Sequence, residues 1–98
     1  MKEPQINYFY DDIAGQHVKL AYRDWGSEES QLPCLICAHG ITHNSRIFDV
    51  AATQLRTDFR VICPDAPGRG RSEWLSRKLR YNYETYISNT HKLLKEID

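Results

Sequence analysis

Hydrophobic and polar residues alternate near the start of the chain, over residues 6–10 and again over residues 17–23. Alternation of this kind is typical of a strand that has one buried face and one exposed face. The two stretches are separated by the turn-rich segment 11–16, which reads Asp-Asp-Ile-Ala-Gly-Gln. The pattern therefore predicts an antiparallel hairpin over residues 6–24.

A continuous apolar run follows the hairpin at residues 34–38, and residues 59–63, apolar except for Arg60, predict a second short buried strand. Because the first run lacks alternation, it indicates a strand that is covered on both faces, as in a parallel sheet. Apolar residues between the runs recur four positions apart, at Ile47, Ala51 and Leu55, with Phe48 and Ala52 beside them. This spacing predicts a helix with one apolar face, whose start Thr42, Asn44 or Ser45 can cap. Residues 34–64 are therefore expected to form a strand–helix–strand unit.

The final segment carries apolar and aromatic residues three and four positions apart, at Tyr83, Tyr86, Ile87, Leu93, Leu94 and Ile97. This spacing predicts an amphipathic helix over residues 82–97, preceded by a loop over residues 65–80. The order hairpin, strand, helix, strand, helix predicts one α/β domain over residues 1–98, with a right-handed crossover.

Composition limits the classes of partner. The 98 residues include 13 Lys and Arg against 13 Asp and Glu, so the chain has no net charge that would attract it to nucleic acid or to a membrane surface. No apolar run approaches the roughly 20 residues of a membrane-spanning helix, and the first residues lack the apolar stretch of a signal peptide. Three cysteines, an odd number, lie in apolar runs and are expected to be reduced core residues: Cys34, Cys37 and Cys63. These features predict a cytoplasmic protein.

The first apolar run ends in His39-Gly40-Ile41, just ahead of the predicted helix. Glycine at this point permits a tight turn and lets a ligand approach the backbone closely. The first amides of a helix have no partner within the helix, so they are available as donors to an oxyanion. An ordinary strand-to-helix turn, in which the His39 ring bonds to nearby backbone, accounts for the same residues.

The second apolar run leads into a glycine-rich loop, Asp65-Ala66-Pro67-Gly68-Arg69-Gly70-Arg71-Ser72. Gly68 and Gly70 permit positive φ, and the Asp65 carboxylate can accept hydrogen bonds from loop amides. The residues themselves therefore indicate a structural role for Asp65, Gly68, Gly70 and Ser72.

Taken in this order, the two loops resemble those of the N-terminal part of an α/β-hydrolase of the serine-hydrolase type. The likeness covers roughly residues 8–97, with the second loop similar to the family's D-x-x-G-x-G-x-S pattern and Arg69 where many members have His. The resemblance implies that the backbone N–H of Ile41 is one donor of an oxyanion hole. It also implies that His39 and Gly40 support this loop and that the His39 ring is not the catalytic base.

The resemblance implies an incomplete sheet in the order 1-2-4-3, with the strand at residues 34–38 at its edge. In this family the triad follows in the order Ser, Asp or Glu, His, and all three would lie beyond Asp98. The expected function is therefore that of an inactive fragment of a hydrolase acting on a small ester, a lactone or a related acyl bond, without a cofactor. The edge strand is expected to promote self-association, so a non-catalytic module is the alternative.

Three further motifs are weaker candidates. Ser72 lies in Gly70-Arg71-Ser72-Glu73-Trp74, where Trp74 replaces the second glycine of the G-x-S-x-G nucleophile turn. The same stretch lacks the third glycine of G-x-G-x-x-G, which disfavours a nucleotide-binding module. Residues three apart in a strand point to opposite faces, which disfavours a zinc site built from Cys34, Cys37, His39 and His43.

Overall fold

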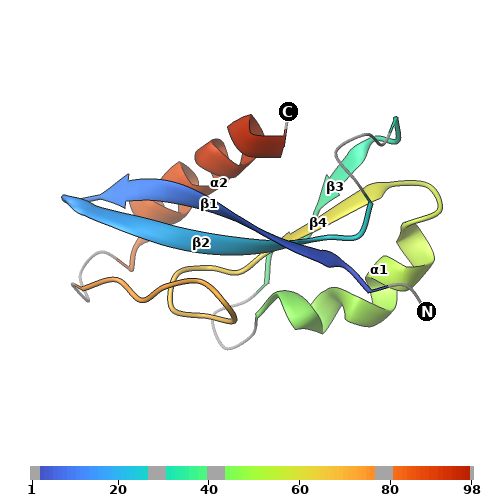
Figure 1. Cartoon of the computed structure of the whole chain (residues 1–98), viewed down its shortest axis with the longest axis horizontal. Helices are drawn as coiled ribbons and strands as arrows, with labels where there is room; N and C mark the ends of the chain where they lie inside the picture. The colour runs from blue at the N-terminus through green and yellow to red at the C-terminus, as the bar shows by residue number, and fades with distance from the viewer. Residues whose placement is uncertain (1–2, 27–30, 40–43, 77–80, 98) are drawn as a thin grey trace.

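The computed structural model describes residues 3–26, 31–39, 44–76 and 81–97. Four strands form one sheet in the order β1-β2-β4-β3, with β3 and β4 parallel and the other pairs antiparallel. The elements, drawn in Figure 1, are β1 (Gln5–Ile13), β2 (Gln16–Asp24), β3 (Cys34–Ile36), the 3-10 helix η1 (Ser45–Phe48), α1 (Asp49–Leu55), β4 (Arg60–Pro64) and α2 (Tyr83–Ile97). The predicted α/β arrangement and sheet order are therefore confirmed.

The hairpin turns more tightly than the sequence pattern predicts. β1 and β2 pair over the full nine residues of each strand, so Asp11 and Asp12 belong to β1 and not to a loop. The turn consists of Ala14 and Gly15, with φ of 48° and 85°. Two successive residues with positive φ suit the right-handed twist of a hairpin, which explains why the turn is this short.

Strand β3 is shorter and more exposed than predicted for residues 34–38. It ends at Ile36, Cys34 is exposed, and residues 35–37 are only partly buried. Within the described part of the chain, β4 is the only strand that pairs with β3. The expectation of a strand covered on both faces is therefore wrong for β3 in this structure, because β3 forms the edge of the sheet.

The helix after β3 presents a different face to the sheet from the one predicted. Ile47 is 52% exposed and Ala51 is also exposed, whereas Ala52 is buried and Phe48 and Leu55 are partly buried. The segment begins as a 3-10 turn, which has about 3.0 residues per turn and shifts the phase of the following α-helix. Of the predicted caps, Asn44 caps the start through its side chain, which accepts a hydrogen bond from the Arg46 amide. Thr42 lies outside the described residues.

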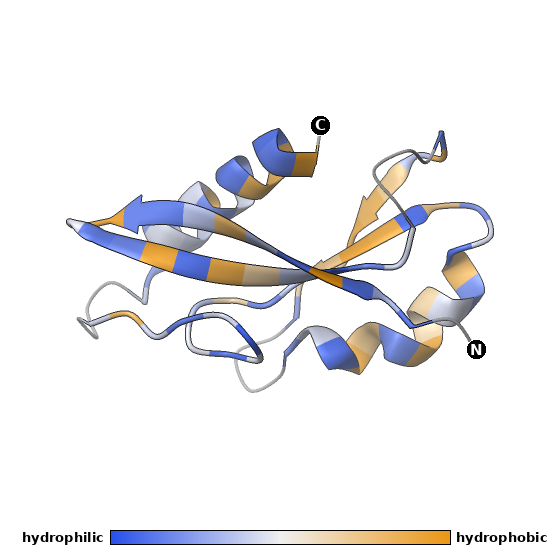
Figure 2. Ribbon diagram, in the orientation of Figure 1, coloured by the Kyte–Doolittle hydropathy of each residue, from blue (hydrophilic) through white to orange (hydrophobic). Residues whose placement is uncertain are grey.

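The sheet buries a hydrophobic cluster on each face. Alternate residues of β2 pack with Ile62 and with Leu93 of α2 on one face, and Figure 2 shows the alternation along β2. On the other face, Val61 and Cys63 pack with Trp25 and with Ala52 of α1. This arrangement explains the three successive apolar residues 61–63 of β4, because their side chains enter the two clusters alternately.

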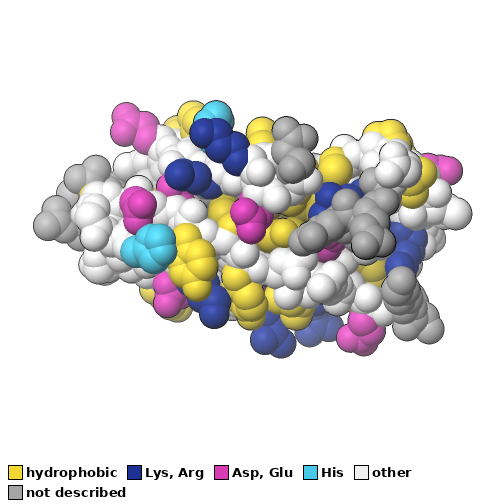
Figure 3. Space-filling model, turned by 45° about the horizontal axis from the view of Figure 1, so that its top comes forward, with side chains coloured by type: hydrophobic (Ala, Val, Ile, Leu, Met, Phe, Trp, Pro, Cys, Tyr) yellow, Lys and Arg dark blue, Asp and Glu magenta, His cyan; other side chains and the backbone are white. Residues whose placement is uncertain are grey.

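Helix α2 packs on the sheet through a narrower face than its apolar residues predict. Its buried residues are Thr85, Asn89 and Leu93, whereas Tyr83, Ile87 and Leu94 are largely exposed. Figure 3 turns the top of Figure 1, where α2 lies, toward the viewer and shows hydrophobic and charged side chains interspersed there. In the described ranges, no helix is long and apolar enough to cross a membrane.

A buried carboxylate explains the orientation of α2. Asp11 of β1 is 2% exposed, and its Oδ2 accepts hydrogen bonds from Ser88 Oγ at 2.7 Å and from Asn89 Nδ2 at 2.9 Å. A buried carboxylate is costly unless it is hydrogen-bonded, so this pair of donors must face the hairpin. The polar edge of α2 is therefore turned inward and part of its apolar stripe outward.

Candidate active-site loops

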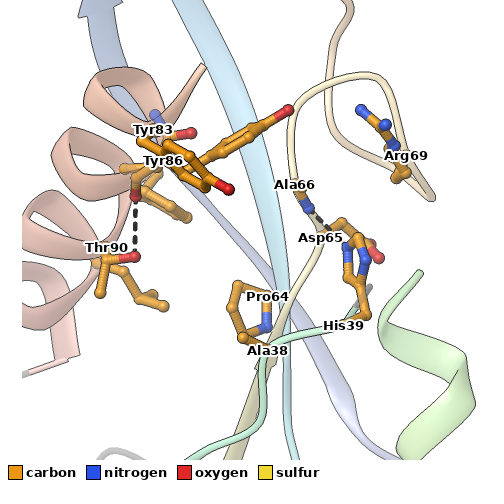
Figure 4. A pocket seen from close by; sticks show the side chains of 12 residues that line it. Ala38, His39, Pro64, Asp65, Ala66, Arg69, Tyr83, Tyr86 and Thr90 are labelled. Carbon is orange, nitrogen blue, oxygen red and sulfur yellow. Dashed lines mark hydrogen bonds between the residues drawn. The ribbon is translucent and has the colours of Figure 1, made fainter. Parts of the chain in front are cut away.

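The loops that follow β3 and β4 are joined through the imidazole of His39. Its Nε2 accepts a hydrogen bond from the backbone N–H of Ala66 at 2.9 Å, as Figure 4 shows. Because Nε2 accepts, the ring carries no proton on that nitrogen in this arrangement. Both loops leave the carboxyl ends of adjacent parallel strands, which places residues 39 and 66 at the same edge of the sheet.

Asp65 makes a second link, between the β4 loop and the start of η1. Its Oδ1 accepts from the Ser45 amide at 2.7 Å, and its Oδ2 accepts from the Arg71 amide at 3.2 Å. The side chain is buried, with the residue 5% exposed. Hydrogen bonds from neutral amides to a buried carboxylate are stronger than ordinary ones, so Asp65 fixes the position of the helix start relative to the loop.

Gly70 and Gly68 allow the β4 loop to fold back on itself. Both have positive φ, 52° at Gly70 and 75° at Gly68. A Cβ at Gly70 would collide with the carboxylate of Asp65, and one at Gly68 would meet Trp74 and the Tyr81 hydroxyl, each at 3.0 Å. Glycine is therefore required at residue 70 both by the backbone angle and by the space.

The hydroxyl of Ser72 holds the same loop against β2. Ser72 is 6% exposed; its Oγ donates to the Asp65 carbonyl at 2.6 Å and accepts from the Ala21 amide at 2.8 Å. Both partners are backbone groups, so the Ser72 hydroxyl anchors the β4 loop to β2 in this structure.

The predicted oxyanion donor, Ile41, lies outside the described residues, as do Gly40 and His43. The described helix begins later, at Ser45, and its first amides already have partners. Ser45 N–H donates to Asp65, Arg46 N–H to the Asn44 side chain and Ile47 N–H to the Asn44 carbonyl. Amides 45–47 are therefore not free oxyanion donors, and the assignment to Ile41 stays a prediction.

A pocket of about 470 Å³ opens between α2 and the carboxyl ends of β3 and β4. His39, Asp65 and Arg69 lie on one side of it, and Tyr83 and Tyr86 of α2 lie on the other (Figure 4). The Arg69 guanidinium also lies over the ring of Tyr81, 5.8 Å from its centre. The pocket therefore combines an apolar wall with a polar rim formed by the two loops.

The cysteines are arranged differently from the expectation of three core residues. Cys63 is fully buried and Cys37 partly buried, but Cys34 is exposed because it lies on the edge strand. Burial and the neighbouring Cys37 raise the pKa of the Cys63 thiol to about 12. Over the described ranges, no cluster of three or more His, Cys, Asp or Glu side chains could hold a metal ion.

Several links at this site have no signal in the sequence. The sequence indicates Ser45 only as a helix cap, yet its amide donates to Asp65 and its Oγ accepts from Arg23 Nε at 3.1 Å. The approach of Cys37 to Cys63 is an exception, since it follows from the parallel pairing of the two predicted strands. The contact between Asp65 and Ser45 depends on loop conformation and could not have been inferred.

Comparisons with known proteins agree with this geometry, although no family model matches the chain. The chain is 42% identical over 85 residues to a 3-hydroxybutyrate-oligomer hydrolase of Cupriavidus necator, which covers 87% of this chain and 28% of that relative. A hydrolase of Rickettsia typhi superposes with a TM-score of 0.85 at 33% identity, covering 95% of this chain and 35% of the other.

An α/β hydrolase from Novosphingobium aromaticivorans superposes with a TM-score of 0.80 at 30% identity, covering 98% of this chain and 32% of the other. The chain belongs to the α/β hydrolases. This α/β hydrolase chain carries only part of the fold, since it spans about a third of the length of these relatives. The resemblance inferred from the two loops is therefore confirmed.

Proposed function

We propose that this α/β hydrolase chain contributes one oxyanion donor, the backbone N–H of Ile41, to a serine hydrolase that cleaves small esters or related acyl compounds. The contact between His39 Nε2 and the Ala66 amide carries the proposal, because it ties the chain just before Gly40 and Ile41 to the β4 loop. A backbone donor held in place before charge develops stabilises a tetrahedral intermediate without reorganisation. His39 acts in this scheme as the support of the loop.

The other catalytic groups are proposed to lie outside these 98 residues. The sequence contains no G-x-S-x-G, and the Ser72 hydroxyl is engaged with Asp65 and Ala21. The nucleophilic serine, its acid and its histidine base would therefore come from further chain, and no cofactor is needed for acyl transfer. The name of the Cupriavidus necator relative supports an acyl substrate, since oligomers of 3-hydroxybutyrate are joined by ester bonds. The odd cysteine count supports a reducing, cytoplasmic compartment.

A chimera tests the oxyanion assignment. The matching 85-residue segment of the Cupriavidus necator hydrolase is replaced by this chain, and hydrolysis of p-nitrophenyl butyrate and 3-hydroxybutyrate oligomers is followed. We expect Ile41→Pro, which removes the N–H, to lower kcat about 10²–10³-fold, the usual effect of losing one oxyanion donor. Ile41→Val, which keeps the N–H, should leave kcat unchanged.

Circular dichroism of the two chimeras separates a lost donor from a lost fold. Equal kcat for Ile41→Pro and Ile41→Val in folded chimeras would refute the assignment. The 98-residue chain alone is expected to show no turnover above buffer. Turnover by this chain that disappears in Ser72→Ala would instead make Ser72 the nucleophile.

We also propose that the isolated chain self-associates through β3. This strand is at the edge of the sheet, where its outer backbone groups can pair with a second copy. The formal net charge of zero provides no long-range repulsion between copies.

Light scattering coupled to size-exclusion chromatography under reducing conditions tests this association. We expect a dimer or larger species for the parent chain and a shift to monomer for Cys34→Lys, because lysine on an edge strand opposes pairing. Val50→Lys is the matched control, since it adds the same charge at an exposed position of α1, and it should remain associated. A monomeric parent chain at high concentration would exclude pairing through β3.

A further inference from the structure

Cys37, directly after β3, and Cys63 of β4 occupy neighbouring positions on two parallel chain segments. Ile36 of β3 pairs with Ile62 of β4, and the Cys37 amide donates to the Ile62 carbonyl at 2.9 Å. The next positions along the two strands are Cys37 and Cys63. Their side chains belong to the same hydrophobic cluster beneath α1, with Cys63 buried in it and Cys37 packed against it.

The backbone spacing at this position is compatible with a covalent bond. Paired strands lie about 4.8 Å apart, and disulfides usually join residues whose Cα atoms are about 4.4–6.8 Å apart. By contrast, Cys34 is exposed on β3 and does not belong to the cluster beneath α1. Cys37 and Cys63 are therefore the pair of described cysteines that can bond within one copy of the chain.

The two thiols differ in access. Cys63 is fully buried against Val61, Trp25 and Ala52, whereas Cys37 is partly exposed at the open edge of the sheet. Burial raises the pKa of Cys63 to about 12, so this thiol is protonated at neutral pH. A soluble oxidant therefore meets Cys37 first, and Cys63 is the group that resolves the product.

We propose that Cys37 and Cys63 form an oxidisable thiol pair that a hydroperoxide converts into an intramolecular disulfide. The Cys37 sulfur attacks one peroxide oxygen, the O–O bond breaks, and hydroxide leaves as water after taking the thiol proton, which gives a sulfenic acid. The Cys63 sulfur then attacks the Cys37 sulfur, and the sulfenic oxygen leaves as water with the Cys63 proton. Two thiols lose two electrons in total, and hydrogen peroxide is reduced to two water molecules.

The position of the pair connects it to the two loops at the carboxyl end of the sheet. Cys37 precedes His39 by two residues, and Cys63 precedes Asp65 by two residues. The disulfide would therefore join β3 to β4 directly below the hydrogen bonds that hold these loops together. This inference concerns the thiols alone and does not depend on the proposed hydrolase function.

Peptide mapping of the 98-residue chain tests the proposal. The Cys34→Ser variant, which lacks the exposed thiol, is treated with hydrogen peroxide, digested without reductant and analysed by mass spectrometry. We expect loss of both remaining free thiols and a cross-linked peptide that contains Cys37 and Cys63. Dithiothreitol should restore both thiols.

Matched variants and the unmodified sequence complete the test. Cys34→Ser combined with Cys37→Ser should keep its one thiol, at Cys63, through the same treatment. In the parent chain, the same cross-linked peptide should form, so the result does not depend on whether a variant folds. Sulfinic acid at Cys37 with Cys63 still reduced, or disulfides that involve only Cys34, would overturn the proposal.

Discussion

Replacing Arg60 by methionine is expected to lower the free energy of unfolding by about 3–5 kcal/mol, because it leaves the Asp24 carboxylate buried without its counter-charge. Arg60 is 4% exposed and Asp24 is 1% exposed, and Arg60 Nη2 donates to Asp24 Oδ2 at 2.7 Å. The hydrogen bond to Asp24 raises the pKa of Arg60, so the guanidinium remains charged. Arg60 Nη1 also donates to the Ile97 carbonyl at 3.3 Å, so the substitution removes a contact to the end of α2. Urea unfolding followed by circular dichroism measures the change.

The double variant Asp24→Leu with Arg60→Met is the control for this expectation. It removes both charges together, and replacement of a buried ion pair by apolar residues is often close to neutral. We therefore expect the double variant to be more stable than Arg60→Met alone. If Arg60→Met costs less than about 1 kcal/mol, the pair contributes no more than an exposed salt bridge.

Gly70→Ala is expected to lower the free energy of unfolding by about 3 kcal/mol or more. Positive φ at a residue with a Cβ costs about 1–2 kcal/mol. The new Cβ would also displace the Asp65 carboxylate and disturb its hydrogen bonds from the Ser45 and Arg71 amides, each worth about 1.5–3 kcal/mol as bonds to a charged group. Urea unfolding again provides the measurement.

Gly15→Ala is the matched control, because Gly15 also has positive φ but a Cβ there has no neighbour within 4 Å. It should cost only the backbone part of the effect, about 1–2 kcal/mol. Equal losses for the two variants would mean that the contact with Asp65 contributes nothing to stability.

The fold could be predicted from this sequence where local pattern decides the structure. Alternation in residues 17–23 placed β2, and the mostly apolar stretch at residues 59–63 placed β4 in the interior. The sheet order came from the resemblance of the two loops to those of α/β hydrolases and could not have come from periodicity. The position of β3 at the sheet edge then explains why its apolar residues are only half buried.

Side-chain hydrogen bonds between distant segments account for what could not be predicted. The inward face of α2 is set by Asp11, which bonds to Ser88 and Asn89, and a carboxylate in a strand gives no sign of its partners. The phase of α1 is set by a 3-10 turn that begins at Ser45, whose amide is held by Asp65. In the candidate site, His39 and Asp65 could be named from motifs, but their partners Ala66 and Ser45 depend on loop conformation.

The bonds from Asp11 to α2 have a consequence for synthesis on the ribosome. The hairpin is made first, but the donors that satisfy its buried carboxylate follow 77 and 78 residues later in the chain. Until those donors leave the exit tunnel, Asp11 must stay hydrated, so the inner face of the hairpin cannot close around it. The hairpin of β1 and β2 therefore completes its folding only when α2 has also been synthesised.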